Sequence, residues 1–305
     1  MSEEIKKPSI DSQDEIDVIA LFNEVKKSRN LIIYIVSFFA LASIMYSLIL
    51  PKIWISESLL SSIEGSGKSS NAGMSSLGGL ASMAGVSMQS SGKASKADIA
   101  IATLESRDFL KHLLTFDGVL ENLTAFSSFD SEKSISNFDS SKYNAELNKW
   151  IVNPPSYLKA FKEYSLSTSV RVSKNSGLIA ISVYHGSPVF AKTFLDLIIR
   201  ELNSLMRERD LIESEAKLDY LYSQLGTSQM VDVNVAIGQL IEGQLKTQML
   251  AKVRKNYSLQ PIDSPYQPEE RSSPVRTRIV FMGILLGFFV ALLVIISRYY
   301  FIRKS

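Results

Sequence analysis

The chain has 305 residues and a formal net charge of +2, with 33 Lys and Arg against 31 Asp and Glu. So small a net charge does not indicate a nucleic-acid partner. The absence of cysteine excludes structural disulfides, thiolate nucleophiles and cysteine-based zinc sites. Only two histidines occur, His112 and His185, and both are expected to be packing or surface residues. We therefore expect neither a metal site nor a bound cofactor.

Residues 1–30 precede the first long apolar run. Between residues 14 and 25 the apolar positions follow helical spacing, which predicts a short amphipathic helix at the membrane surface. Residues 31–50 and 279–297 then contain no charged side chain. At 1.5 Å per residue each run makes a helix of about 30 Å, the thickness of a bilayer core. A buried core helix is the alternative, but both runs have basic flanks and lie at the chain ends.

These two runs predict two transmembrane helices, of which the first is an uncleaved anchor. Two spans place residues 1–30 and the tail 298–305 on the same side of the membrane. Basic residues near the spans favour the terminal side only slightly, and long loops cross largely regardless of charge. On both grounds we predict cytoplasmic termini and a tethered central domain at 51–278.

The first part of the central domain predicts an α+β fold. Residues 53–60 are β-prone, 61–95 are rich in Ser and Gly and predict a loop, and 96–116 carry a helical apolar stripe. Apolar residues recur at every second position in residues 166–172 and 178–184. The five-residue turn 173–177 joins these segments, which predicts a hairpin. With 53–60 as a third strand, these elements form an α+β base domain over about 51–187.

Ser187 and Pro188 then give an N-cap and a first helical residue. No proline follows until Pro261, so a long helical region is predicted over about 188–258, with a kink near 226–232. Its second apolar stripe repeats every four residues: Ile237, Ile241, Leu245, Met249 and Val253. One small core cannot explain such length. The region either folds back on its own chain or packs against neighbouring subunits.

Two further motifs lie before and within the second span. A proline cluster at 261–274 predicts a stiff, extended segment or a plain linker: Pro261, Pro265, Pro268 and Pro274. Within the span, Gly283 and Gly287 form GxxxG, a spacing that lets two helices approach closely and predicts an assembly face. On this basis Gly287→Leu is expected to weaken oligomers in detergent.

No catalytic constellation is present. Gly67-Lys68-Ser69 ends like a phosphate-binding loop, but Ser62 occupies the position of the required glycine and Ser/Gly-rich chain follows. Carboxylate pairs such as Glu213 and Glu215 lie in a charge-rich helix and indicate a solvated face. We therefore predict that the protein is not an enzyme.

The order of these features resembles the polysaccharide co-polymerases, the Wzz-type chain-length determinant proteins. Residues 104–110 (LESRDFL), 178–188 (GLIAISVYHGSP) and 261–287 carry most of the resemblance. The stretch GGLASMAG at 78–85 is also similar to a loop of exopolysaccharide members. The resemblance implies a Gram-negative inner-membrane protein with a periplasmic α+β base, a long projecting helix and ring-shaped homo-oligomers. It implies control of the modal length of O-antigen or a related glycan, with the glycan polymerase and lipid-linked polysaccharide as partners.

The chain stops eight residues after Ser297, without the kinase domain of some relatives, which favours the O-antigen branch. The Ser/Gly-rich loop leaves the capsule or exopolysaccharide branch open. Two rival classes remain. One is an adaptor that spans the periplasm in capsule or exopolysaccharide export. The other is a transmembrane sensor, for which the short terminal segments leave little room for an output module.

Overall fold

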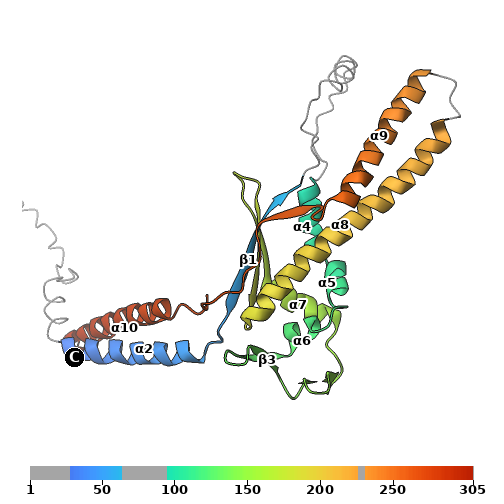
Figure 1. Cartoon of the computed structure of the whole chain (residues 1–305). Helices are drawn as coiled ribbons and strands as arrows, with labels where there is room; N and C mark the ends of the chain where they lie inside the picture. The colour runs from blue at the N-terminus through green and yellow to red at the C-terminus, as the bar shows by residue number, and fades with distance from the viewer. Residues whose placement is uncertain (1–27, 64–94, 226–230, 305) are drawn as a thin grey trace, which may run out of the picture. The chain divides into compact units, whose positions relative to one another are not determined.

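The computed structural model describes residues 28–63, 95–225 and 231–304 (Figure 1). The predicted amphipathic start, the Ser/Gly-rich stretch 64–94 with its GKS sequence, and residues 226–230, which hold most of the predicted kink, lie outside these residues. The chain divides into two compact units. Unit 1 comprises Met1–Lys52 and Ser273–Ser305, and unit 2 comprises Ile53–Ser272.

Unit 1 contains the two apolar helices, α2 (Arg29–Ile49) and α10 (Arg276–Lys304). By length and composition both can cross a membrane, over Arg29–Ile49 and Arg276–Arg298. The two helices pack against each other in antiparallel directions. Small or branched side chains fill the contact, and three of them are almost fully buried: Ser47, Ala291 and Ile295. Most large apolar side chains instead face outward, as expected for helices that contact lipid.

Unit 2 is built on a four-stranded antiparallel sheet in the order β6-β7-β1-β8. The strands are β1 (Trp54–Ser62), β6 (Thr168–Val172), β7 (Ile179–His185) and β8 (Leu259–Asp263). The predicted hairpin is present, and the backbone N–H of Ser173 closes its turn by donating to the carbonyl of Leu178 at 2.8 Å. The predicted third strand, β1, is also present and is central. The sequence analysis missed the fourth strand, β8.

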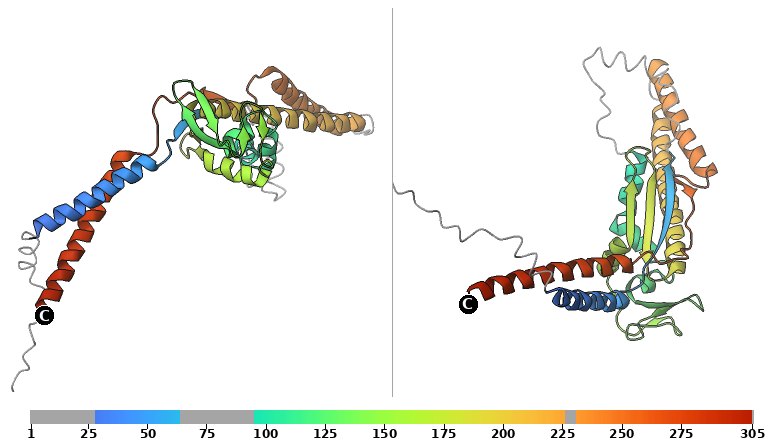
Figure 2. Two further views of the ribbon diagram at one scale, coloured as in Figure 1. Left: turned by 90° about the horizontal axis from the view of Figure 1, so that it is seen from below. Right: turned by 90° about the vertical axis from the view of Figure 1, so that its left-hand side faces the viewer.

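Helix α8 (Pro188–Leu225) covers one face of this sheet (Figure 2). The Ser187 hydroxyl accepts from the N–H of Phe190 at 3.3 Å, so the predicted helix start is confirmed. The first half of α8 buries its apolar stripe with β1 and β7, and the second half extends beyond the sheet (Figure 1). The predicted α+β class with a long helix is therefore confirmed.

The stretch predicted as one helix over 96–116 is two helices, α4 (Lys96–Leu104) and α5 (Arg107–Leu113). Ser95 and Asp98 form a capping box that starts α4. Ser106 then accepts from the N–H of Phe109 and starts a second helix, so the chain turns between Leu104 and Arg107. The turn brings apolar side chains of both helices into one core, including Leu104, Phe109 and Leu113.

Residues 117–167 form further elements, none of which the sequence analysis predicted. They are α6 (Val119–Thr124), β2 (Phe126–Asp130), β3 (Ile135–Phe138), β4 (Tyr143–Asn144), β5 (Lys149–Trp150) and α7 (Tyr157–Ser167). Helix α7 includes Leu166, which the alternating pattern had assigned to a strand. The strand β6 begins two residues later, at Thr168.

The predicted long helical region is a hairpin of α8 and α9 (Val231–Val253), which packs back along α8 (Figure 1). The region therefore folds back on its own chain, which is the first of the two predicted alternatives. The predicted second stripe is wrong as a packing face, because Leu245, Met249 and Val253 are exposed. The main buried or half-buried face instead follows steps of three and four residues, through Asn234, Ile237, Ile241, Gln244, Gln248 and Ala251. Thr247 and Leu250 are half-buried beside it.

One glycine at the end of β7 is fixed by a close aromatic contact. A Cβ at Gly186 would overlap the ring of Phe126. We therefore expect Gly186→Ala to lower the free energy of unfolding by about 1–3 kcal/mol through overpacking. Urea unfolding of the full chain in detergent, followed by tryptophan fluorescence, measures this.

The matched control is Gly238→Ala in α9, where a Cβ meets no atom within 4 Å. There alanine should raise stability by about 1 kcal/mol, because glycine is a poor helix former. Equal effects of the two substitutions would show that the contact with Phe126 does not constrain the position.

Candidate functional site: a polar clasp on the helical hairpin

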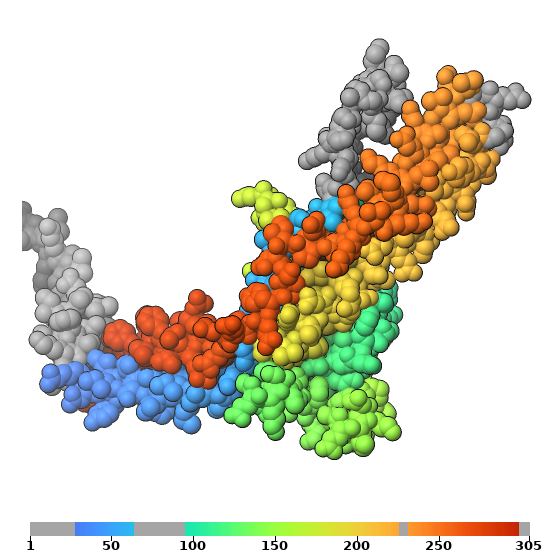
Figure 3. All heavy atoms as spheres, in the orientation of Figure 1, coloured from blue at the N-terminus to red at the C-terminus, as the bar shows by residue number. Residues whose placement is uncertain are grey.

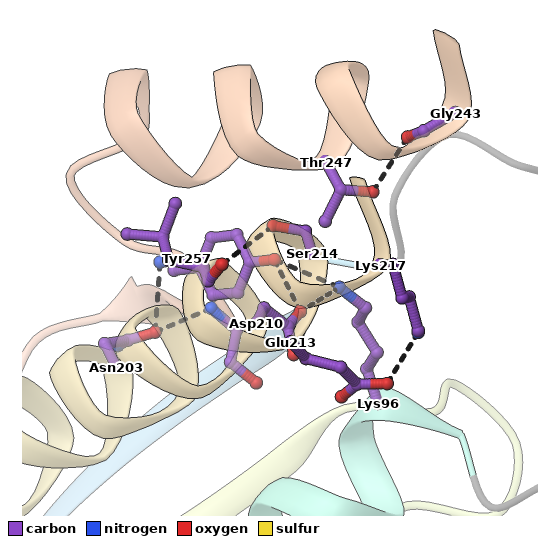
Figure 4. A network of polar contacts seen from close by, with 11 residues as sticks. Lys96, Asn203, Asp210, Glu213, Ser214, Lys217, Gly243, Thr247 and Tyr257 are labelled. Atoms are coloured by element: carbon purple, nitrogen blue, oxygen red, sulfur yellow. Dashed lines mark hydrogen bonds and ion pairs between the residues drawn. The ribbon is translucent and has the colours of Figure 1, made fainter. Parts of the chain in front are cut away.

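Five polar side chains join α4, α8 and the segment that leaves α9, and Figure 4 labels four of them, Lys96, Asn203, Asp210 and Tyr257. We call this group the polar clasp; it consists of Lys96, Asn203, Arg207, Asp210 and Tyr257. Three of its members lie on α8 and face the returning chain at residues 254–259. The clasp therefore determines where the helical hairpin closes onto the base of unit 2.

Asn203 is the buried centre of the clasp, with 4 % of its surface exposed. Its Oδ1 accepts from the backbone N–H groups of Tyr257, Ser258 and Leu259 at 3.1, 2.8 and 3.0 Å. Its Nδ2 donates to the carbonyls of Ile199 and Leu259 at 3.0 and 2.9 Å. One amide thus satisfies the backbone of the turn that leads from α9 into β8.

Arg207 acts one helical turn further along α8. Its guanidinium donates to the carbonyls of Arg254 and Lys255 at 2.9 and 2.6 Å, directly after the last residue of α9. A cation at this position satisfies unpaired carbonyls and is favoured by the helix dipole. Arg207 therefore caps the C-terminus of α9.

The outer part of the clasp is an ion pair with a phenol. The Nζ of Lys96 donates to Asp210 at 2.6 Å and to the Tyr257 hydroxyl at 3.2 Å. Tyr257 in turn donates to Asp210 at 2.5 Å. Burial lowers the pKa of Lys96, but its hydrogen bonds to Asp210 and Tyr257 outweigh burial and raise that pKa overall. Burial and the hydrogen bond to Asp210 raise the pKa of Tyr257. Lys96 therefore stays charged and Tyr257 stays neutral near neutral pH, and their hydrogen bonds to Asp210 join α4 and the returning chain to α8.

A cleft of about 290 Å³ lies beside the clasp, between α4, α8 and α9. Its lining is polar and of mixed charge: Lys96, Ile99, Met206, Arg209, Asp210, Glu213, Ser214, Lys217, Gln244 and Thr247. Glu213 and Lys217 pair at 2.6 Å, so most of the charges in the cleft are already compensated. Among the described residues no group of three or more His, Asp or Glu could hold a metal ion.

The predicted proline segment packs along the sheet for most of its length. Pro261 lies in β8 opposite Leu60, and Pro265 and Pro268 are buried. The hydroxyls of Ser56 and Ser58 in β1 donate to the carbonyls of Tyr266 and Asp263 at 2.7 and 2.6 Å. These contacts hold the segment as a strap beside β1. Pro274 lies beyond the strap, in unit 1.

The predicted GxxxG glycines face α2 of the same chain. A Cβ at Gly283 would lie 2.5 Å from the Cβ of Ser43. At Gly287 it would lie 2.8 Å from the Cβ of Phe39 and 3.2 Å from the Cα of Val36. Both glycines thus allow the two helix backbones to approach closely. A role in assembly between copies stays a prediction.

The two histidines occupy different sites. His112 on α5 lies 3.0 Å from Glu201 on α8, which also accepts from Arg200 at 2.9 Å. Burial raises the pKa of Glu201, but the hydrogen bonds from His112 and Arg200 lower it overall. His185 is buried between the rings of Phe126 and Phe190. Both residues hold elements together, as the sequence analysis expected of packing residues.

His185 makes the stability of unit 2 dependent on pH. Its Nδ1 accepts from the N–H of Ser187 at 3.0 Å, so Nε2 carries the proton and donates to the carbonyl of Asn122 at 3.0 Å. Burial lowers the pKa of His185 below its ordinary value of 6.5. Below pH 6.5 the unfolded chain therefore binds a proton that the native protein does not.

Stability should consequently fall as the pH drops below 6.5, by up to about 1.4 kcal/mol per pH unit, and level off below the native pKa. Urea unfolding between pH 5 and 8 tests this against His185→Gln, which cannot titrate. The variant should lack this part of the pH dependence, whereas His112→Gln should retain it. Parallel curves for the native chain and His185→Gln would contradict the assignment.

Together these features define a class of protein: an α+β unit with a helical hairpin, joined at both ends to helices able to cross a membrane.

Comparison of the sequence with models of known protein families gives a more specific result. Residues 14–115, about a third of the chain, match the model of the chain length determinant protein family, Wzz. The resemblance to Wzz-type polysaccharide co-polymerases is therefore confirmed.

Similar solved structures include a full-length bacterial polysaccharide co-polymerase, with 12 % identity over 95 % of this chain and 99 % of that one, at a TM-score of 0.43. Another is a fragment of WzzB, a polysaccharide co-polymerase from Salmonella Typhimurium. It has 13 % identity over 73 % of this chain and 100 % of that one, at a TM-score of 0.31. The search of curated proteins found no match.

The sequence analysis missed the polar clasp. Asn203 follows Leu202 inside a buried stripe, and a polar residue at a core position of a helix was the available signal. The sequence gives no comparable signal for the other charged or phenolic members, Lys96, Asp210 and Tyr257. These residues are far apart in sequence and resemble ordinary surface residues.

Proposed function

We propose that this protein regulates the modal chain length of a surface polysaccharide, with the O-antigen of lipopolysaccharide as the first candidate. The observation that carries the proposal is the match of residues 14–115 to the chain length determinant family. The two apolar helices support it, because they would anchor unit 2 at both ends. The protein would lie in the inner membrane of a Gram-negative bacterium, with cytoplasmic termini and a periplasmic unit 2.

In this proposal the protein is a scaffold and not an enzyme. Homo-oligomers, ring-shaped by analogy with the family, would present many copies of unit 2 to the glycan polymerase and its lipid-linked product. Repeated weak contacts could then retain a growing glycan, because effective concentration replaces affinity.

The test is a surface-polysaccharide gel of a deletion strain and its complemented form. Loss of the gene should convert a clustered band pattern into a short, random ladder, and complementation should restore the cluster. An unchanged distribution would contradict length control.

A second candidate is an adaptor for capsule or exopolysaccharide export. The observation that favours it is the antiparallel hairpin of α8 and α9, since long helical hairpins suit proteins that reach across the periplasm. The same gel separates the two functions. An adaptor mutant should lose surface polymer while the polymer that remains keeps its length distribution.

A further inference from the structure

We propose that residues 147–162 of unit 2 bind the headgroup region of an anionic lipid bilayer. This proposal rests on the membrane anchoring described above. We call residues 147–162 the basic aromatic strip. The strip reads LNKWIVNPPSYLKAFK and includes β5 and the first half of α7.

The composition of the strip matches a membrane interface. It contains three lysines, Lys149, Lys159 and Lys162, and no acidic residue; the nearest acidic residues in sequence, Glu146 and Glu163, lie just outside it. Trp and Tyr are enriched at the level of lipid headgroups, and basic side chains near an anionic surface contribute about 1 kcal/mol each. Tryptophan, tyrosine, apolar residues and lysine occur together in this one segment.

The strip is open on the surface of unit 2. Leu147, Ile151 and Leu158 are 66 %, 57 % and 52 % exposed, and all three lysines are exposed. Figure 3 shows the part of unit 2 that contains the strip, in green, uncovered on the side drawn. Burial of these apolar side chains in the interface is favourable by about 25 cal/mol per Å².

Basic residues of α5 extend the same surface. The Nζ of Lys111 lies 4.9 Å from the ring centre of Tyr157, and the guanidinium of Arg107 lies 5.8 Å from that of Phe161. Lys111 also pairs with Asp108 at 3.2 Å, so it contributes less charge than the lysines of the strip. The surface therefore combines aromatic rings with cations from two neighbouring helices.

The two chain segments that connect unit 2 to the apolar helices leave it at the same place. The N–H of Ser272 donates to the carbonyl of Ile53 at 2.9 Å, so the first and last residues of unit 2 are hydrogen-bonded neighbours. Three residues separate each of them from an apolar helix, since α2 ends at Ile49 and α10 begins at Arg276. Such short connections reach at most about 14 Å. If the two helices span a bilayer, this end of unit 2 is held close to it.

Aromatic contacts connect that end of unit 2 to the strip. Trp54, the residue after Ile53, packs edge-on against Phe129 of β2 at 6.0 Å. Phe138 of β3 packs on Tyr143 at 5.3 Å, and Tyr143 packs on Trp150 at 5.2 Å. Figure 1 shows β3 at the end of the sheet where β1 begins. The strip thus belongs to the tethered end of unit 2, whereas the C-terminal part of α8 extends in the opposite direction (Figure 1).

The chain contains only two tryptophans, which makes a direct test possible. In the full-length Trp54→Phe variant, Trp150 is the only tryptophan. The variant is reconstituted into phosphatidylcholine vesicles with and without phosphatidylglycerol, and brominated phosphatidylcholine serves as the quencher. The control variant Trp54→Phe/Trp150→Phe/Tyr222→Trp places the only tryptophan at an exposed position of α8.

We expect quenching of Trp150 to be several-fold stronger than at position 222, and stronger still with phosphatidylglycerol. Lys149→Gln/Lys159→Gln/Lys162→Gln should remove the phosphatidylglycerol dependence. Equal quenching at positions 150 and 222 overturns the proposal. So does an emission of Trp150 that is shifted to the blue without lipid quenching, because a protein would then cover the strip.

Flotation of the vesicles keeps this test separate from the proposed function. Protein that floats but shows no preferential quenching contradicts only the lipid contact of the strip. Protein that does not float contradicts the membrane anchoring, and with it both proposals. A gel that excludes length control leaves the quenching result intact.

Discussion

Asn203→Ala should lower the free energy of unfolding by about 3–5 kcal/mol, because three backbone N–H groups lose their shared acceptor, Asn203 Oδ1, in a buried turn. Each unsatisfied buried donor costs about 1–3 kcal/mol, and partial access of water reduces the sum. Urea unfolding of the full chain in detergent measures the loss. Both tryptophans, Trp54 and Trp150, lie in unit 2 and report its unfolding.

Asn153→Ala is the matched control, since Asn153 is exposed in the loop before α7. It should change stability by no more than about 0.5 kcal/mol. Asn203→Asp keeps an acceptor oxygen but loses the two donated hydrogen bonds, and it should lie between the native chain and the alanine variant. A loss below about 1 kcal/mol for Asn203→Ala would mean that water replaces the amide and that the clasp does not hold the turn.

Gly287→Leu should separate α2 from α10. A leucine at this position would have to displace Phe39 and the backbone at Val36. Close approach of small residues is the main attraction between helices in lipid, so the contact should be lost and not merely loosened. The readout is the labelling of a single thiol, Ser47→Cys, in the otherwise cysteine-free chain, because Ser47 is only 2 % exposed in the helix pair. Its reaction with a membrane-permeant maleimide in proteoliposomes should become several-fold faster when Gly287→Leu is added.

Phe289→Leu in α10 is the control, because this side chain is 62 % exposed and lies about 200° around the helix from Gly287. It should leave the labelling rate unchanged. Oligomer mass in detergent provides the second readout. If labelling becomes faster and the mass stays constant, the glycines act within one chain and the predicted assembly face is wrong. An unchanged labelling rate would contradict the helix contact itself.

The sequence predicted those elements whose signals are local. The β6–β7 hairpin follows from alternation on both sides of Gly177, which adopts a φ of 67°. The start of α8 follows from Ser187 and Pro188. The strand β8 was missed because a proline such as Pro261 argues against a strand. The sheet tolerates this proline because β8 is an edge strand.

The packing face of α9 was missed for a geometric reason. Positions four residues apart rotate by about 40° around a helix, so a stripe from Ile237 to Val253 drifts away from any one partner. Steps of three and four residues keep one face toward α8, but that face includes Gln244 and Gln248 and is not purely apolar. The polar clasp depends on contacts between distant segments, such as Lys96 with Asp210, and no local pattern encodes these.

The pairing of β1 with β8 also has a consequence for how the protein is made. Leu60 pairs with Pro261, about 200 residues later in the chain. At about 5–20 residues per second, ribosomes need about 10–40 s to supply that partner. During this time β1 can pair with β7 once residues 179–185 emerge, but one edge of β1 stays unpaired until β8 is made. Unit 2 therefore completes its sheet only as synthesis reaches the second apolar helix, α10. Any contact that needs the finished sheet can form only at this late stage of synthesis.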